Sequence, residues 1–325
     1  MRIWGIVAAM VLGLVSTAAA APLEVKQVSA EAKQVVHVDV DAMRNSLLVQ
    51  RAYDAVTQRW PDAQSRFDDV TDLVNHLGIE LERDLHGVTF YSLEVGKPEG
   101  VLLVDAVVDQ QALLEKADQA PDHEKTTYEK YELHSWTDAK GKRHEHPMVG
   151  TLARPSLLVF APTVDQVKAA LDVLDGKSPS LAGKESPLTA KVPEGTMLLV
   201  RVVGLAGAHL PWKSPVVTEC ESLSLLIGEN DGKVSLAGKL AAKTKETADQ
   251  IKAIVDGGRA TAELRAANDA EVVKLLKAVK VELADTTMSV ELSAPVDDVW
   301  TLAEKAATVA AKRAKKKAEA GQQEK

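Results

Sequence analysis

Residues 87–116 read GVTFYSLEVGKPEGVLLVDAVVDQQALLEK, and this stretch decides the expected fold. Its pattern predicts a strand, a tight turn, a second strand and then a helix. A similar stretch returns at residues 223–253, which read LSLLIGENDGKVSLAGKLAAKTKETADQIKA. Because glycine accepts positive φ without steric cost, glycines are expected to bracket the turn in each stretch. They are Gly96 and Gly100 in the first stretch and Gly228 and Gly232 in the second.

Outward from these stretches, both halves of the chain follow the same expected order of strand, hairpin, helix, hairpin and helix. Hairpins imply antiparallel pairing, and amphipathic helices imply one covered sheet face. The sequence therefore predicts an α+β fold of two related halves, each an antiparallel sheet of hairpins covered on one face by helices. In the first half, Asp41 is the expected N-cap of a helix over residues 42–60, and a second helix is expected over residues 65–77.

The first residues predict export. Met1 and Arg2 give a short positive start, residues 3–15 are apolar, and residues 16–21 are mostly small. This pattern is typical of a secretory signal peptide with cleavage near Ala21. The mature protein is expected to be soluble and periplasmic or extracellular. No later stretch is apolar and long enough to be a transmembrane helix.

Composition divides the chain further. Stretches of proline, glycine and serine without periodicity indicate loops, and the basic C-terminus indicates a frayed end. The expected divisions are a signal peptide (1–21), a flexible leader (22–34), a first α+β half (35–176), a linker (177–193), a second α+β half (194–311) and a basic disordered tail (312–325).

Charge is unevenly distributed along the chain. The formal net charge is −8, whereas residues 312–325 hold six basic and two acidic residues and so carry +4. The rest of the chain is therefore −12, which argues against nucleic acid as a partner because attraction to phosphate needs a basic face. The run from Lys312 to Lys317 fits either a solvated chain end or contact with an anionic surface, and the solvated end is favoured.

Cys220 is the only cysteine in the chain. No intrachain disulfide can form, so the core must hold by burial alone. The place of Cys220 beside an apolar strand predicts a buried, inert thiol, because a catalytic thiol would need a histidine next to it.

Several short motifs carry a resemblance to known proteins. They are Val38-Asp39, Arg44-Asn45-Ser46, Gly78-Ile79, Arg83-Asp84-Leu85, Gly87-Val88-Thr89 and residues 171–179, which read LDVLDGKSP. In these motifs the chain resembles an uncharacterised family of exported proteins of planctomycete-type bacteria, over most of its expected mature length. The resemblance implies no activity, cofactor or functional residue.

The segment His144-Glu145-His146 is the densest cluster of metal-type ligands in the sequence. Residues two apart on a strand share a face, so His144 and His146 can hold one ion, with His134 or Asp138 of the neighbouring strand as third ligand. Lysine and arginine residues nearby repel a cation, and a solvated hairpin end is the favoured alternative. The predicted metal ligands are His134, His144 and His146.

His37, Asp39 and Asp41 form a second candidate group. A carboxylate beside a histidine suits a general base and its orienting partner. In the favoured alternative Asp41 caps a helix and the other two residues are ordinary strand positions. The sequence contains none of the common nucleophile, zinc-protease or dinucleotide motifs, so neither a catalytic residue nor a cofactor is predicted.

These observations lead to three functional hypotheses. The first is an exported, non-catalytic protein that binds a partner protein or an envelope component. The second is a carrier of an apolar ligand, held between the sheet and its helices. The third is a metal-dependent hydrolase that uses His134, His144 and His146.

Overall fold

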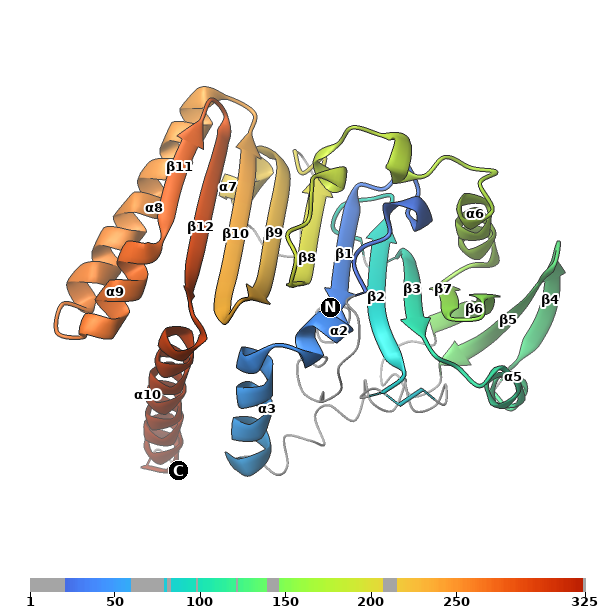
Figure 1. Ribbon diagram of the computed structural model, residues 1–325, viewed down its shortest axis with the longest axis horizontal. Helices are drawn as coiled ribbons and strands as arrows, with labels where there is room; N and C mark the ends of the chain where they lie inside the picture. Colours follow the sequence, from blue (N-terminus) through green and yellow to red (C-terminus); the bar gives the residue numbers. More distant parts are fainter. Residues whose placement is uncertain are drawn as a thin grey trace.

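The computed structural model describes residues 21–59, 79–80, 83–97, 99–120, 122–138, 146–206 and 215–323. The expected signal peptide, apart from Ala21, and the expected helix over residues 65–77 lie outside these residues. The fold is α+β, as predicted: the described strands form one antiparallel sheet of twelve strands, in the order β11-β12-β10-β9-β8-β1-β2-β3-β7-β6-β5-β4 (Figure 1).

The bounds of the elements follow the chain. The strands are β1 (Gln34–Asp39), β2 (Leu85–Ser92), β3 (Val101–Ala106), β4 (Glu124–Tyr128), β5 (Tyr131–Asp138), β6 (His146–Arg154), β7 (Leu157–Ala161), β8 (Thr196–Val203), β9 (Cys220–Asn230), β10 (Lys233–Ala242), β11 (Lys280–Ala284) and β12 (Thr287–Pro295). The helices are α2 (Val40–Arg44), α3 (Leu47–Arg59), α5 (Gln110–Asp118), α6 (Val164–Leu174), α7 (Pro215–Thr218), α8 (Lys245–Arg265), α9 (Ala270–Ala278) and α10 (Val296–Gln323), with short 3₁₀ turns η1 (Val25–Gln27), η3 (Leu181–Gly183) and η4 (Pro187–Thr189). Among the described residues, no helix combines the length and apolarity needed to cross a bilayer.

The two halves of the chain meet at the pair β1 and β8. Val36 in β1 pairs with Phe90 of its own half on one side and with Val200 of the other half on the other side. The halves therefore share a single continuous sheet. Each half runs outward from this central pair through its first three strands, which are β1, β2 and β3 in the first half and β8, β9 and β10 in the second. The strand beyond the third comes from later in the chain: β7 lies beside β3, and β12 lies beside β10. The strand order is alike in the two halves, whereas the sequence duplication itself stays a prediction.

The turn glycines are only partly as expected. Gly96 has positive φ in the turn after β2, which confirms its predicted role. Asp231 and Gly232, both with positive φ, form the two-residue turn between β9 and β10. Gly228 does not bracket that turn, and that expectation is wrong. It lies inside β9, where a Cβ atom would stand 2.5 Å from the carbonyl oxygen of Gly195.

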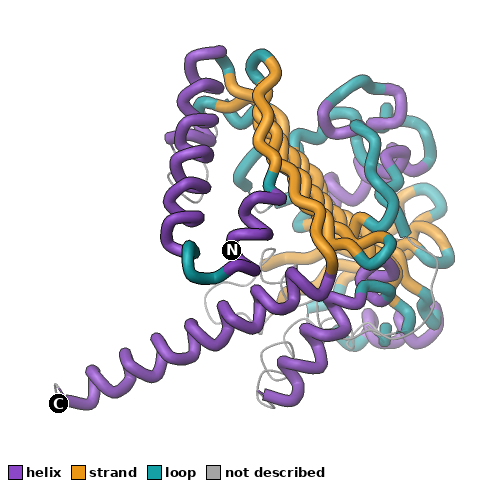
Figure 2. Tube along the Cα trace, turned by 60° about the vertical axis from the view of Figure 1, so that its left-hand side comes forward, coloured by secondary structure: helices purple, strands orange, loops and turns teal. Residues whose placement is uncertain are grey.

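The inner strands of the first half are buried on both faces of the sheet, beyond the one covered face that was expected, whereas the edge strand β4 is mostly exposed. Every residue of β7 is buried, because its LLVFA run is apolar at successive positions. Val159 packs with Leu171 of α6 on one face, and Leu158 packs with Leu113 of α5 on the other. In the second half α8 and α9 lie on one face of the sheet, where Ile251 of α8 joins the core (Figure 2).

The expected flexible leader and linker are both wrong, because their apolar residues belong to the core. Val28 and Leu181 are fully buried, and Leu188 is 1% exposed. The Leu181 amide donates a hydrogen bond to the Val28 carbonyl oxygen, which ties the two segments together. The expected disordered tail is also corrected, since α10 continues to Gln323.

The helix after β1 begins earlier than predicted. Asp39, rather than Asp41, is the N-cap of α2, and its carboxylate accepts the Ala42 amide at 2.7 Å. The chain then leaves the helix at Asn45, and α3 begins at Leu47.

A side chain from the other half of the molecule caps α3. The carboxylate of Glu229 in β9 accepts the amides of Leu47 and Leu48, each at 3.0 Å, and the hydroxyl of Ser46 at 2.6 Å. A carboxylate at this position satisfies amides that have no partner within the helix. Glu229 therefore joins the two halves.

Replacing Glu229 with alanine is expected to lower the free energy of unfolding by about 1–2 kcal/mol, as loss of a helix cap does. Denaturant unfolding of the purified protein measures the change. The matched control is Glu221→Ala, on an exposed position of the same strand, which should have little effect. Equal unfolding midpoints for the two variants would contradict the capping role.

Candidate functional site

The structure brings His134 together with two residues that the sequence did not single out. Asp118 ends α5, His123 precedes β4 and His134 lies in β5. One ligand atom from each residue lies within 4.8 Å of the others. Nε2 of His123 is 2.9 Å from Nδ1 of His134, and Nδ1 of His123 is 3.8 Å from a carboxylate oxygen of Asp118. Two imidazoles and a carboxylate at this spacing suit a divalent transition-metal ion.

The electrostatics of His134 favour its neutral form. His134 is 5% exposed, and burial lowers the pKa of its imidazole, with His123 and Lys125 lowering it further. Its Nε2 atom is buried and has no hydrogen-bond partner among the described residues, which is costly for a polar atom. Neutral imidazole is the form that binds a metal ion. Lys125 is already paired with Glu132 at 2.8 Å.

The register of β5 and β6 separates His134 from His146. His134 pairs with Gly150, whereas His146 pairs with Asp138, four positions further along the ladder. That spacing is about 13 Å along the strand, so a single ion is not shared by these two residues, which corrects the expected set. His144 lies outside the described residues, and its pairing with His146 stays a prediction.

The group of His37, Asp39 and Asp41 is buried, but it is not arranged as a catalytic pair. Nδ1 of His37 lies 2.8 Å from the Thr89 hydroxyl, and Nε2 lies 2.9 Å from the Ala21 carbonyl oxygen. A carbonyl only accepts, so Nε2 carries the hydrogen and Nδ1 accepts from Thr89 in the neutral ring. Both ring nitrogens are thus occupied by groups other than Asp39.

Asp41 belongs to a buried ion pair. It is 2% exposed and accepts a hydrogen bond from Nη1 of Arg44, which is 1% exposed. Nη2 of Arg44 donates to the Leu85 carbonyl oxygen, and Nδ1 of His86 lies 3.0 Å from the Asp41 carboxylate. These contacts hold α2 against β2, which is a structural role.

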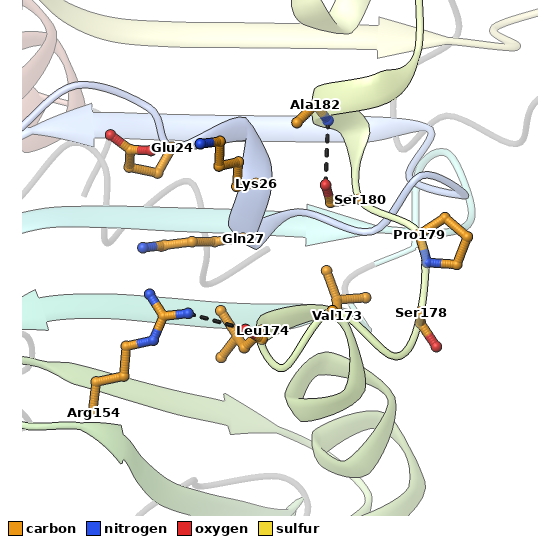
Figure 3. Close-up of a pocket in the computed structure, with 11 residues that line it drawn as sticks. Glu24, Lys26, Gln27, Arg154, Val173, Leu174, Ser178, Pro179, Ser180 and Ala182 are labelled. Carbon is orange, nitrogen blue, oxygen red and sulfur yellow. Dashed lines mark hydrogen bonds between the residues drawn. The ribbon is translucent and has the colours of Figure 1, made fainter.

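A pocket of about 530 Å³ opens where η1, the end of α6 and η3 meet (Figure 3). Arg154, at the end of β6, donates to the Leu174 carbonyl oxygen at 3.0 Å and so caps α6. Glu24 and Lys26 also line the pocket. Because three charged side chains face this space, it is not the apolar cavity that the carrier hypothesis requires.

A second concave region is an open groove of about 750 Å³ between α8, α9 and α10. Small and aliphatic side chains dominate its lining, which includes Gly258, Thr261, Ala262, Ala266, Val272 and Val309. Ion pairs join α9 to α10 beside it, with Lys305 at 2.8 Å from Asp269 and Lys274 at 2.7 Å from Asp298. The groove is therefore held by packed helices rather than by loops.

Cys220 is fully buried, as predicted, and its Sγ donates to the Val216 carbonyl oxygen at 3.1 Å. Burial raises the pKa of the thiol, with the Glu219 charge adding to the effect. A thiol with a raised pKa is a poor nucleophile at neutral pH.

Comparison with known proteins gives no family. No protein-family model matches the chain, and no curated protein matches it. The structure is similar to crystal form III of TP0453, with a TM-score of 0.46 and 10% identity over 86% of this chain and 97% of that chain. For crystal form I of TP0453 the TM-score is 0.45 and the identity 9%, over 88% and 98%. This similarity carries no argument about function, and the resemblance to an exported family stays a prediction.

Sequence reasoning found His134 but missed Asp118 and His123. They lie 16 and 11 positions before His134, outside the spacings typical of zinc motifs. The pairing of β4 with β5, in which Lys125 lies opposite His134, brings this part of the chain back alongside the strand. No local signal in the sequence identifies the group.

Proposed function

We propose that this chain is an exported, non-catalytic protein that binds a partner protein, and that the groove between α8, α9 and α10 receives the partner. The observation that carries the proposal is apolar exposure around this groove. Val309, which lines the groove, is 48% exposed, and Ile254 and Leu264 are 61% and 79% exposed on α8, the helix that supplies much of the lining. Large aliphatic side chains gathered at a concave surface are typical of protein interaction sites.

The shape of the groove favours a helical partner. Ile254, Gly258 and Thr261 lie at helical spacing on α8, so they form one seam along its surface. Small residues let another helix approach closely, and an amphipathic helix can lay its apolar face along such a seam.

Charge favours an acidic partner. Arg265 lines the groove, and the sequence after Val309 is rich in basic residues. An apolar helix face flanked by aspartate or glutamate would complement these cations. The proposed partner is therefore a protein that presents an acidic amphipathic helix.

A photo-crosslinking amino acid at Thr261, introduced in the producing cells, tests the proposal. The crosslinked protein is identified, purified and titrated against this chain. Val309→Asp is expected to weaken that binding by at least about tenfold, because it places a negative charge on the α10 side of the groove, where the partner's apolar face would pack. The location of the protein in the same cells tests export.

The matched control is Leu114→Asp, on a 37%-exposed position of α5 far along the chain from the groove. It should leave the affinity unchanged. Binding that is insensitive to Val309→Asp, or crosslinks that form equally from position 114, would rule out the groove as the interface.

A second candidate function is metal binding at Asp118, His123 and His134, favoured by the spacing of their ligand atoms, which all lie within 4.8 Å of one another. Native mass spectrometry with metal analysis is expected to find one bound divalent ion per chain after incubation with zinc. His123→Ala should lower the affinity by about 100-fold, since it removes one of three ligands.

The control for the metal experiment is His146→Ala together with His144→Ala. These changes should leave binding at Asp118 intact. If the double variant lost the ion and His123→Ala kept it, the site would be the cluster predicted from the sequence, His134, His144 and His146. Absence of any bound ion in the wild-type protein would exclude both sites.

A further inference from the structure

The carboxylate of Asp39 is buried without an ion-pair partner among the described residues. Asp39 is 2% exposed at the end of β1. Among the described residues, the groups that donate to its oxygens are the backbone amides of Ala42, Ala21 and Asp41. A buried carboxylate is expensive unless a cation compensates it.

The nearby charges compensate Asp39 only in part. Arg44 interacts with the charge of Asp39, but it makes its hydrogen-bonded ion pair with the second buried carboxylate, Asp41, beside which His86 also lies. Among the described residues, two buried carboxylates thus share one buried guanidinium group. Burial raises the pKa of Asp39, and the charge of Asp41 raises it further, whereas the backbone amides act in the opposite direction. One additional cation would balance the cluster.

Ala21 is the residue held directly against Asp39. Its amide donates to the Asp39 carboxylate, and its carbonyl oxygen accepts from Nε2 of His37 at 2.9 Å. Gly87 lies opposite Asp39 in the β1–β2 ladder. A Cβ atom at Gly87 would stand 3.4 Å from the Cβ of Ala21, so the lack of a side chain at Gly87 leaves room for Ala21. His37, Asp39 and Gly87 form what we call the Ala21 socket.

The sequence before the socket is a small-residue cleavage region. Ala18 and Ala20 satisfy the small-x-small pattern for a cut after Ala20, and Ala19 and Ala21 satisfy it for a cut after Ala21. Only the first cut turns the amide that faces Asp39 into an α-amino group. Such a group is protonated near neutral pH and offers three donors in place of one.

We propose that Ala21 is the first residue of the mature protein and that its α-ammonium group binds the Asp39 carboxylate in the Ala21 socket. This inference rests on the export proposed above. Removal of a signal peptide that ends at Ala20, one residue before the expected division, then supplies the missing cation, and a charge-assisted hydrogen bond replaces a neutral one. The mature chain is thereby more stable than the precursor, so cleavage and final stability are coupled.

Three forms of the chain test the socket in vitro, independently of export. One begins at Ala21 with a free amine, one begins at Ala21 with an acetylated amine, and one carries Gly-Ser before Ala21. Urea unfolding is expected to give an unfolding constant about tenfold smaller for the free amine than for the other two. Asp39→Asn should abolish the difference. Equal constants for the three forms would overturn the proposal, and the acetylated chain keeps this test valid even if Asp39→Asn fails to fold.

N-terminal sequencing of the protein from the producing cells tests the cleavage position. Ala21 as the first residue of the exported protein is the expected result. An exported chain that begins at another residue overturns this inference alone, whereas an uncleaved chain retained in the cytoplasm overturns the proposed export.

Discussion

Replacing Arg44 with methionine is expected to lower the free energy of unfolding by about 3–5 kcal/mol, the usual cost of breaking a buried ion pair. Arg44 and Asp41 are 1% and 2% exposed. Methionine fills much of the space of the side chain, but it leaves the Leu85 carbonyl oxygen without the guanidinium donor and the Asp41 carboxylate with only its contact to His86. Denaturant unfolding at neutral pH measures the change.

Two further variants make the experiment decisive. Arg83→Met removes an arginine whose own side chain is 69% exposed, although that of its partner Asp84 is 9% exposed, and it should cost much less stability than Arg44→Met, because solvent screens the exposed guanidinium group. The double variant Asp41→Asn with Arg44→Met should recover part of the loss, since it no longer buries an uncompensated charge. A single variant R44M as stable as R83M would show that the pair carries no such energy.

Acidification is expected to destabilise the protein through His37. Burial lowers the pKa of His37 to about 4, against which its hydrogen bond with Ala21 acts only partly. In the unfolded chain the pKa is about 6.5. The folded state therefore favours the neutral ring. The stability that this preference contributes is fully present above about pH 6.5 and is lost progressively as the pH falls toward 4, with a total of about 3 kcal/mol.

Denaturant unfolding of the wild-type protein and His37→Gln between pH 7.5 and pH 4 tests this effect. Glutamine can still donate to the Ala21 carbonyl oxygen, but it does not titrate. The variant should lose stability less steeply below about pH 6.5. The titration of Asp39 is common to both proteins, so the difference between the two curves reports His37. Parallel curves would contradict the assignment.

Local sequence patterns predicted most of the elements because each pattern has a local cause. The alternation in Val35–Val40 and the apolar runs of β2, β3 and β7 need only the period of a strand to be recognised. Asp109 marks where α5 begins, because its carboxylate accepts two amides of that helix. The turn at Asp231-Gly232 likewise follows from the preference of these residues for positive φ.

Where two local signals lay close together in the sequence, the tertiary structure determined which of them took effect. Asp39 and Asp41 are both good caps, and Asp39 caps α2 because β1 ends there, while Asp41 turns inward to Arg44. The leader and the linker look like loops in sequence, yet Val28 and Leu181 fill the core of the first half. A segment without periodicity can still be packed when a few apolar residues reach a preformed hydrophobic surface.

By itself, the sequence determined the α+β class, the antiparallel hairpins and the buried thiol of Cys220. Only the tertiary structure decided that the two halves form one sheet, that Glu229 caps α3, and that Asp118 and His123 stand beside His134. The physical reason is the range of the interactions. Periodicity and capping act within a few residues, whereas strand register and the packing of one half on the other determine which distant side chains meet.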